Sequence, residues 1–125
     1  MKILKRMQRL YVAPDALDAT VSFYETIQHA ECEMRLRLDA IGIEVAVVDG
    51  VILLAGNETA LAPVRDAQVA FVVDSLDSAF REVHGAGAEI LHEPCDAIGG
   101  RNFTARHPDG LVVEYYEPEL KLSAE

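Results

Sequence analysis

The feature that most constrains the fold of this sequence is an internal repeat of about sixty residues. "LDATVSFYETIQHAE" begins at Leu17 and "LDSAFREVHGAGAE" begins at Leu76, an offset of 59 residues. "DGVILLAG" begins at Asp49 and "DGLVVEYY" begins at Asp109, an offset of 60 residues. The difference of one residue is a change in loop length, which costs little free energy. The repeat therefore predicts one supersecondary unit that the chain builds twice.

Each half of the sequence predicts the same order of elements. A strand precedes a helix, at 8–13 and about 16–28 in the first half and at 68–73 and about 76–86 in the second. Three strands follow in each half, and Asp-Gly, the strongest short hairpin signal, joins the last two. These strands are predicted at about 32–40, 42–48 and 51–56, and again at about 88–92, 100–106 and 111–117. Candidate helix caps are Asp15 or Asp18 for the first helix and Asp74 or Ser75 for the second.

The predicted fold is therefore α+β, with two tandem βαβββ modules that form a curved mixed sheet. Module one occupies about 5–60 and module two about 66–118, within one domain of residues 1–125. Because one helix can cover only one face of a four-stranded sheet, the other face must meet a second sheet, a partner subunit or a ligand. We expect the two modules to enclose a cleft.

Charge and composition exclude several classes of protein. The net charge of −10 repels phosphate backbones, so no nucleic acid is expected as a partner, whereas the same charge favours cationic ligands. Apolar runs such as "VILLAG" at 51–56 have the length of strands, and the start of the chain lacks the pattern of a signal peptide. We expect a cytoplasmic protein that does not enter a membrane. Cys32 and Cys95 lie far apart in sequence and are expected to be reduced thiols.

Four stretches of the sequence resemble a known family. They are "LDATVSFYE" at 17–25, "VDSLDSAF" at 73–80, "GAGAEIL" at 85–91 and "GGRNFTARHPDGLVVEYYEP" at 99–118. The chain thereby resembles the vicinal oxygen chelate superfamily, which includes glyoxalase I, bleomycin-resistance proteins and extradiol dioxygenases. The resemblance implies the glyoxalase/bleomycin-resistance fold and a homodimer. It does not fix a function, because the fold hosts many chemistries.

Metal-dependent members of that superfamily place one ligand on the first and last strand of each module. Carried over through the family motif and the repeat, the resemblance places these positions at Arg9, Leu54, Gln68 and Glu114. Leucine donates nothing to a metal, and an arginine repels a cation at a distance of a few ångströms. If the alignment of the first strand is shifted by one residue, Gln8 or Leu10 occupies the first ligand position instead of Arg9. We therefore predict no metal and no cofactor.

The alternation of side chains along the strands predicts what lines the cleft. The lining is mainly apolar and aromatic, with three polar groups, which suits a flat organic ligand. The predicted ligand-binding residues are Arg9, Tyr11, Ile52, Leu54, Gln68, Val72, Glu114 and Tyr116. A filled core between the sheets is the alternative interpretation. Of the four histidines, His92 and His107 could reach the mouth of the cleft.

Two functional hypotheses follow. The first is a metal-independent binding protein that resembles the bleomycin-resistance proteins and captures an aromatic or cationic natural product or antibiotic. The alternative is a glyoxalase-like lyase, isomerase or dioxygenase in which Glu114 is the general base or acid, either metal-free or with a reduced metal site. In both cases the expected partners are a small organic ligand and a second copy of the chain.

Overall fold

The structure, a computed structural model, describes residues 1–119. The chain divides into two compact units, an N-terminal unit of Met7–Asp66 and a C-terminal unit that combines Met1–Arg6 with the chain from Ala67 onwards. Each unit is a four-stranded sheet with one long helix, in the order β-α-β-β-β. The prediction of an α+β fold with two βαβββ modules is confirmed.

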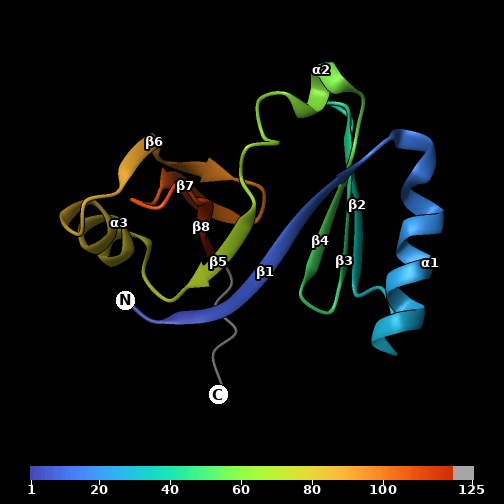
Figure 1. The fold of residues 1–125 in the computed structure, drawn as a ribbon, viewed down its shortest axis with the longest axis horizontal. Coiled ribbons are helices and arrows are strands. Elements are labelled where there is room, and N and C mark those ends of the chain that lie inside the picture. The colour runs from blue at the N-terminus through green and yellow to red at the C-terminus, as the bar shows by residue number, and fades with distance from the viewer. Residues whose placement is uncertain (120–125) are drawn as a thin grey trace. The chain divides into compact units, whose positions relative to one another are not determined.

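The N-terminal unit has the strand order β2-β3-β4-β1. Strands β2, β3 and β4 are antiparallel, and β1 is parallel to β4. Figure 1 shows α1 lying alongside the sheet formed by β2, β3 and β4. The elements are β1 (Ile3–Val12), the 3-10 turn η1 (Pro14–Ala16), α1 (Leu17–Gln28), β2 (Met34–Leu38), β3 (Ile43–Val48), β4 (Val51–Ala55) and α2 (Glu58–Leu61).

Helix α1 forms the core of this unit with one face of the sheet. Leu17 and Val21 are four residues apart, share one face of the helix and are buried against Ala46, Val48 and Leu53. The predicted hairpin between β3 and β4 is confirmed. Asp49 and Gly50 have φ values of 33° and 84°, the pair of positive values that a two-residue type I′ turn requires.

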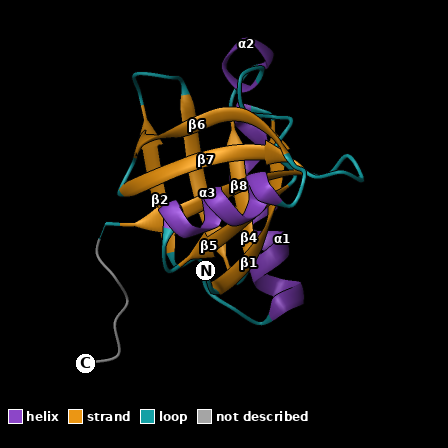
Figure 2. Cartoon of the chain, turned by 90° about the vertical axis from the view of Figure 1, so that its left-hand side faces the viewer, coloured by secondary structure: helices purple, strands orange, loops and turns teal. Residues whose placement is uncertain are grey.

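The C-terminal unit has the strand order β5-β8-β7-β6. Strand β5 is parallel to β8, and β8, β7 and β6 are antiparallel to one another in turn. Figure 2 shows α3 lying across one face of this sheet. The elements are β5 (Val69–Val73), α3 (Leu76–Gly85), β6 (Glu89–Ala97), β7 (Gly100–Arg106) and β8 (Val112–Pro118).

The face of the C-terminal sheet beneath α3 carries its core. Leu76, Ala79 and Val83 of the helix are buried against Phe103 and Tyr115, whose rings stack with centroids 4.8 Å apart. Alternate residues of β5, and of the chain from Leu111 into β8, pack in this cluster beneath the helix. They are Val69, Phe71, Val73, Leu111, Val113 and Tyr115. The residues between them therefore belong to the opposite face, which α3 does not cover.

The first six residues of the chain contact the C-terminal unit. Ile3 packs against its core. Lys2 and Asp74 exchange two hydrogen bonds, from Lys2 N to Asp74 Oδ1 at 2.7 Å and from Asp74 N to the Lys2 carbonyl at 3.1 Å. The amino terminus of Met1 forms an ion pair with Glu82. Strand β1 thus begins in one unit and continues in the other.

The structure corrects several details of the sequence prediction. The short elements η1 and α2 were not expected, and β6 runs to Ala97 instead of ending near residue 92. The prediction that Asp15 or Asp18 caps α1 is wrong, because the N-cap residue is Ala16 and no side chain caps the helix. Ser75 does cap α3, since its hydroxyl accepts a hydrogen bond from Ser78 N. Among residues 1–119, no helix has the length and apolar character needed to cross a bilayer.

Candidate functional site

In the N-terminal unit, Arg9 and Tyr11 lie two residues apart on β1 and interact directly. Arg9 Nε donates a hydrogen bond to the Tyr11 hydroxyl at 2.8 Å, and that hydroxyl donates to the Val64 carbonyl at 2.8 Å. The guanidinium carbon also lies 5.6 Å from the centroid of the Tyr11 ring, within range of a cation–π contact. This half-buried pair presents a fixed cation and an aromatic ring on the face of the sheet that lies opposite α1.

The two predicted aliphatic residues of this unit pack beneath α2. Leu54 is only 7 % exposed and forms an apolar cluster with Ile43 and Leu61, against which Ile52 and Tyr11 also pack. Leu61 belongs to the unexpected helix α2. Leu54 therefore fills a local core, whereas Ile52 and Tyr11 remain partly exposed at its border.

In the C-terminal unit, Glu114 lies on the face opposite α3, half-buried between Ala70 of β5 and Thr104 of β7. Asn102 Nδ2 donates a hydrogen bond to Glu114 Oε2 at 2.8 Å. An acidic side chain that is half-buried in a strand loses part of its hydration. The amide donor compensates part of the cost of burying this carboxylate. Gln68 is exposed, and its Oε1 accepts a hydrogen bond from Val112 N at 3.3 Å.

Val72 of β5 and Tyr116 of β8 are register partners, and both lie on the same face of the sheet as Glu114. The Tyr116 hydroxyl donates a hydrogen bond to the Ile98 carbonyl at 2.8 Å, which ties the loop between β6 and β7 to the sheet. Burial raises the pKa of Tyr116, and the negative charges of Glu114 and Glu119 raise it further. The tyrosine is therefore a neutral hydrogen-bonding group at ordinary pH, in an acidic neighbourhood.

The strand register of each unit agrees with the alignment of the repeat. Tyr11 is the partner of Leu54 in one unit, and Ala70 is the partner of Glu114 in the other. Arg9 and Gln68 each precede that partner by two residues. The four positions that the resemblance assigns to metal ligands are therefore equivalent in pairs, as the offsets of 59 and 60 residues predict.

The residues at these positions do not fit a divalent metal ion. Leu54 has no donor atom, and the Arg9 guanidinium is a cation held by the Tyr11 hydroxyl. Glu114 is an oxygen ligand, but Oε2 accepts from Asn102, and Oε1 of Gln68 accepts from the backbone. Within residues 1–119, no group of three or more His, Cys, Asp and Glu side chains is arranged to hold a metal.

Sequence reasoning missed several polar residues on the same face as Glu114. Asn102 and Thr104 alternate with the buried Phe103 and Ala105 along β7, so the alternation in "GGRNFTAR" carried the signal. His92 was predicted to reach the mouth of a cleft, and it contacts Thr104, with Nε2 at 2.9 Å from Oγ1. His107 lies elsewhere, with its Nε2 at 2.7 Å from the hydroxyl of the buried Tyr115.

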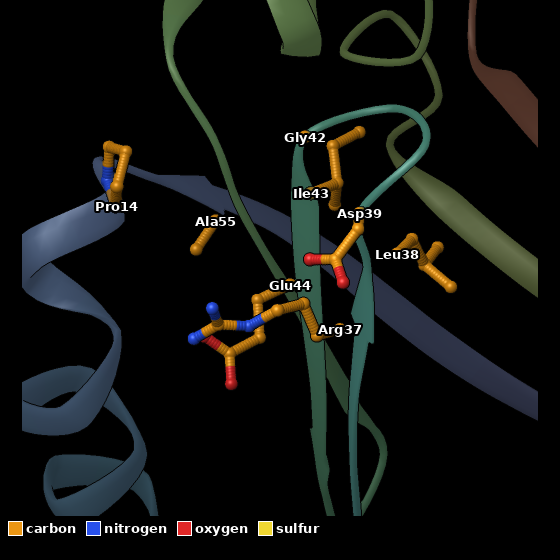
Figure 3. Close-up of a pocket in the computed structure, with 8 residues that line it drawn as sticks. All are labelled: Pro14, Arg37, Leu38, Asp39, Gly42, Ile43, Glu44 and Ala55. Carbon is orange, nitrogen blue, oxygen red and sulfur yellow. The ribbon is translucent and has the colours of Figure 1, made fainter.

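The described residues also line two open hollows, neither of which includes a predicted ligand-binding residue. The first, of about 280 Å³, lies between the ends of β2 and β3 and the segment that leads into α1. Its charged side chains are Arg37, Asp39 and Glu44, and Arg37 Nη2 lies 3.8 Å from Glu44 Oε1 (Figure 3). The second, of about 440 Å³, is lined by residues at the ends of β6, β7 and β8. Both are open depressions whose linings mix polar and apolar residues.

Comparison with known proteins identifies relatives of this chain. The family model described as Glyoxalase/Bleomycin resistance protein/Dioxygenase superfamily matches residues 6–115. The crystal structure of an uncharacterized protein from Methanosarcina mazei is 38% identical over 100% of both chains, with a TM-score of 0.80. Methylmalonyl-CoA epimerase from Mycobacterium tuberculosis is 22% identical over 98% of this chain and 93% of that chain, with a TM-score of 0.71.

A third solved structure with this fold contains a ligand. It is a methylmalonyl-CoA epimerase variant from Streptomyces coelicolor in complex with 2-nitronate-propionyl-CoA. Its identity is 21% over 95% of this chain and 100% of that chain, with a TM-score of 0.66. At this level of identity, the likeness to both epimerases shows the fold alone. No protein with a curated description matches the sequence.

Proposed function

The chain belongs to the Glyoxalase/Bleomycin resistance protein/Dioxygenase superfamily, and from that premise we propose that it binds a small organic molecule without a metal ion. The ligand is an aromatic or cationic compound, such as a natural product or antibiotic. The proposed contacts lie on the sheet faces opposite the long helices. They are Arg9, Tyr11 and Ile52 on one unit and Gln68, Val72, Glu114 and Tyr116 on the other, with Leu54 as the apolar floor beneath Ile52 and Tyr11.

The observation that supports this proposal is the set of residues at the four positions that the resemblance assigns to metal ligands. Two of these positions, Arg9 and Leu54, offer a guanidinium and a buried aliphatic side chain in place of metal donors. Lewis-acid catalysis is therefore a poor fit to this chain, whereas binding needs only shape, apolar contact and a few oriented polar groups.

Charge and aromatic content favour the proposed class of ligand. Tyr11 and Tyr116 supply rings for stacking, and Glu114 supplies a carboxylate that can pair with a cation. The net charge of −10 attracts cations over a long range and repels anions. The net negative charge of the protein would repel the phosphate groups of an acyl-CoA ester.

A thermal-shift screen with neutral, cationic and anionic aromatic natural products tests the proposal. A ligand at roughly 100 times its Kd should stabilise the fold by about 2.7 kcal/mol. Calorimetry on the Glu114→Gln variant should then show weaker binding of a cationic hit, while the exposed control Glu31→Gln should bind as the parent does. The absence of any stabilising compound, or hits confined to anions, would count against the proposal.

An enzyme that uses Glu114 is the second candidate, and the hydrogen bond from Asn102 favours it. A half-buried carboxylate held at one oxygen by an amide is oriented as a general base must be. Each compound that stabilises the fold should therefore be incubated with the protein and analysed for conversion. Loss of turnover in Glu114→Gln with retained binding would identify catalysis, whereas binding without turnover in the parent would identify capture.

A further inference from the structure

Strand β6 is the edge strand of the C-terminal sheet, and two irregularities change the direction of its side chains. Ile90 lies opposite Ala105, and the next paired residue, His92, lies opposite Thr104. Two steps along β6 therefore match one step along β7. Between His92 and Cys95, three steps along β6 match two along β7, from Thr104 to Asn102. Each irregularity has the form of a β-bulge, which re-aims the side chains that follow it.

The second bulge brings His92 and Cys95 to the same face, although residues three apart in a regular strand point to opposite faces. Cys95 Sγ lies 3.8 Å from His92 Nδ1 and 3.6 Å from Asn102 Oδ1. Asn102 is the same residue whose amide nitrogen donates to Glu114. A thiol, an imidazole and an amide thus form one connected cluster, and both Cys95 and His92 are exposed to solvent.

The surroundings of His92 suit a ring that takes up a proton and later releases it. Nε2 lies 2.9 Å from Thr104 Oγ1, and Nδ1 lies 3.0 Å from the carbonyl oxygen of Glu93. When both ring nitrogens carry protons, each has an oxygen that can accept a hydrogen bond. The same Nδ1 is the ring nitrogen that contacts the Cys95 sulfur, at 3.8 Å, and Asn102 Oδ1 lies on the same sulfur at 3.6 Å, so the thiol proton has a short path to the ring.

We propose that Cys95, with His92 as its proton acceptor, is a thiol–disulfide exchange site for low-molecular-weight disulfides. In the tautomer whose Nε2 hydrogen is donated to Thr104 Oγ1, His92 Nδ1 takes the thiol proton, and the Cys95 sulfur attacks one sulfur of the disulfide. A new S–S bond forms, the original S–S bond breaks, and the departing thiolate takes the proton back from His92. The products are a mixed disulfide on Cys95 and one free small thiol. This activity does not depend on the proposed ligand-binding function.

Cys32 provides an internal comparison within the same molecule. Its Sγ lies 3.2 Å from the Met34 carbonyl, and the residue is only half exposed. The hydrogen of that thiol is directed at a backbone carbonyl, whereas the Cys95 thiol contacts an imidazole. The structure therefore assigns rapid exchange to Cys95 and slow exchange to Cys32.

Exchange with hydroxyethyl disulfide at neutral pH tests the assignment, followed by mass spectrometry of the peptides that contain each cysteine. Because Cys95 is also the more exposed thiol, the reference is Cys95 in the same chain unfolded in urea. Folded Cys95 should react about five- to ten-fold faster than this reference, because the neighbouring imidazole accepts the thiol proton as the sulfur attacks. Equal rates in the folded and unfolded chains would overturn the proposal.

Variants separate the role of the imidazole from simple exposure. His92→Gln keeps a polar side chain beside Thr104 but removes the base, so the Cys95 rate should fall to that of the unfolded chain. The matched control is His84→Gln, at an exposed histidine of α3, which should leave the rate unchanged. Thr104→Val should give an intermediate rate, because it removes the oxygen that orients the ring. A Cys95 rate that is unaffected by His92→Gln would show that exposure alone accounts for the reactivity.

Discussion

Tyr115 is the most buried tyrosine among the described residues, and one hydrogen-bonding contact satisfies its hydroxyl. The residue is 3 % exposed, and its hydroxyl lies 2.7 Å from His107 Nε2. We expect His107→Ala to lower the free energy of unfolding by about 1–3 kcal/mol, because it leaves a buried hydroxyl without this partner. Chemical denaturation measures the loss.

A double-mutant cycle with Tyr115→Phe isolates the hydrogen bond from the other contacts of the histidine. Tyr115→Phe alone should cost about 1 kcal/mol, and adding His107→Ala to it should cost less than His107→Ala does in the parent. Strictly additive losses would show that the pair makes no net contribution.

The pKa of Tyr115 is raised by burial, which gives stability a defined dependence on pH. Because the folded value lies above the ordinary value of 10.0, the stability that this group contributes is complete below that pH. It is lost as the pH rises through the raised folded value. Tyr115→Phe should therefore show a smaller loss of stability in alkaline solution than the parent, as measured by thermal melts. Identical alkaline profiles would contradict this prediction.

Tyr116 should report directly on the charge of Glu114. Burial is the main cause of its raised pKa, but the carboxylate of Glu114 contributes as well. Glu114→Gln should lower the Tyr116 pKa in a phenolate absorbance titration, with Tyr116→Phe used to identify its signal. An unchanged titration would show that the charge of Glu114 does not act on the Tyr116 hydroxyl. Glu31→Gln, at an exposed glutamate, is the matched control.

Among the elements, the two-residue turn between β3 and β4 depends on glycine at one position. Gly50 has a φ of 84°, in the left-handed region that disfavours a side chain, although no neighbour would touch an added Cβ. Gly50→Ala should therefore destabilise the protein by about 1 kcal/mol through backbone strain alone. Denaturant unfolding measures the change.

Gly85 is the matched control for that substitution. It ends α3 without a positive φ, and nothing lies within 4 Å of an added Cβ. Gly85→Ala should stabilise the protein by about 0.5 kcal/mol, because alanine loses less backbone entropy on folding. If both substitutions had the same sign, backbone conformation would not be the cause of either effect.

The elements that the sequence predicts well are those in which local signals agree with the tertiary structure. Both long helices, both hairpins and the division of β5 and β8 into two faces follow from periodicity and from the Asp-Gly turns. The bulges of β6 do not, because "EILHEPCDA" has no regular alternation and its register depends on β7. The burial of Leu54 depends on α2, a single turn too short for a periodic signal.

Local sequence signals also predict only part of the candidate site. The register supports the equivalence of Arg9 with Gln68 and of Leu54 with Glu114, because a repeated strand pair keeps its spacing. The partner of Glu114 could not be identified in the same way, since Asn102 is twelve residues away on another strand. Contacts of this kind depend on which strands are neighbours, and no local pattern carries that information.

At the scale of the whole molecule, self-association remains a prediction. Met34 and Leu36 are exposed on β2, the edge strand of the N-terminal sheet, and an apolar edge favours pairing with another chain. We expect sedimentation at micromolar concentration to give a homodimer, about twice the mass of the 13.7 kDa chain. Leu36→Lys should shift the protein towards monomer, and Ile98→Lys, at an exposed loop residue, should not. A monomeric parent would contradict the prediction.

The first strand has a practical consequence for any attempt to separate the halves. A fragment that begins at the repeat boundary near residue 67 lacks Ile3 and the Lys2 backbone groups that hydrogen-bond to Asp74. Cutting the gene in two at that point would therefore give a C-terminal piece with an incomplete hydrophobic interior. Co-expression with a fragment that keeps the first six residues should rescue its solubility, whereas a fragment that starts at Met7 should not.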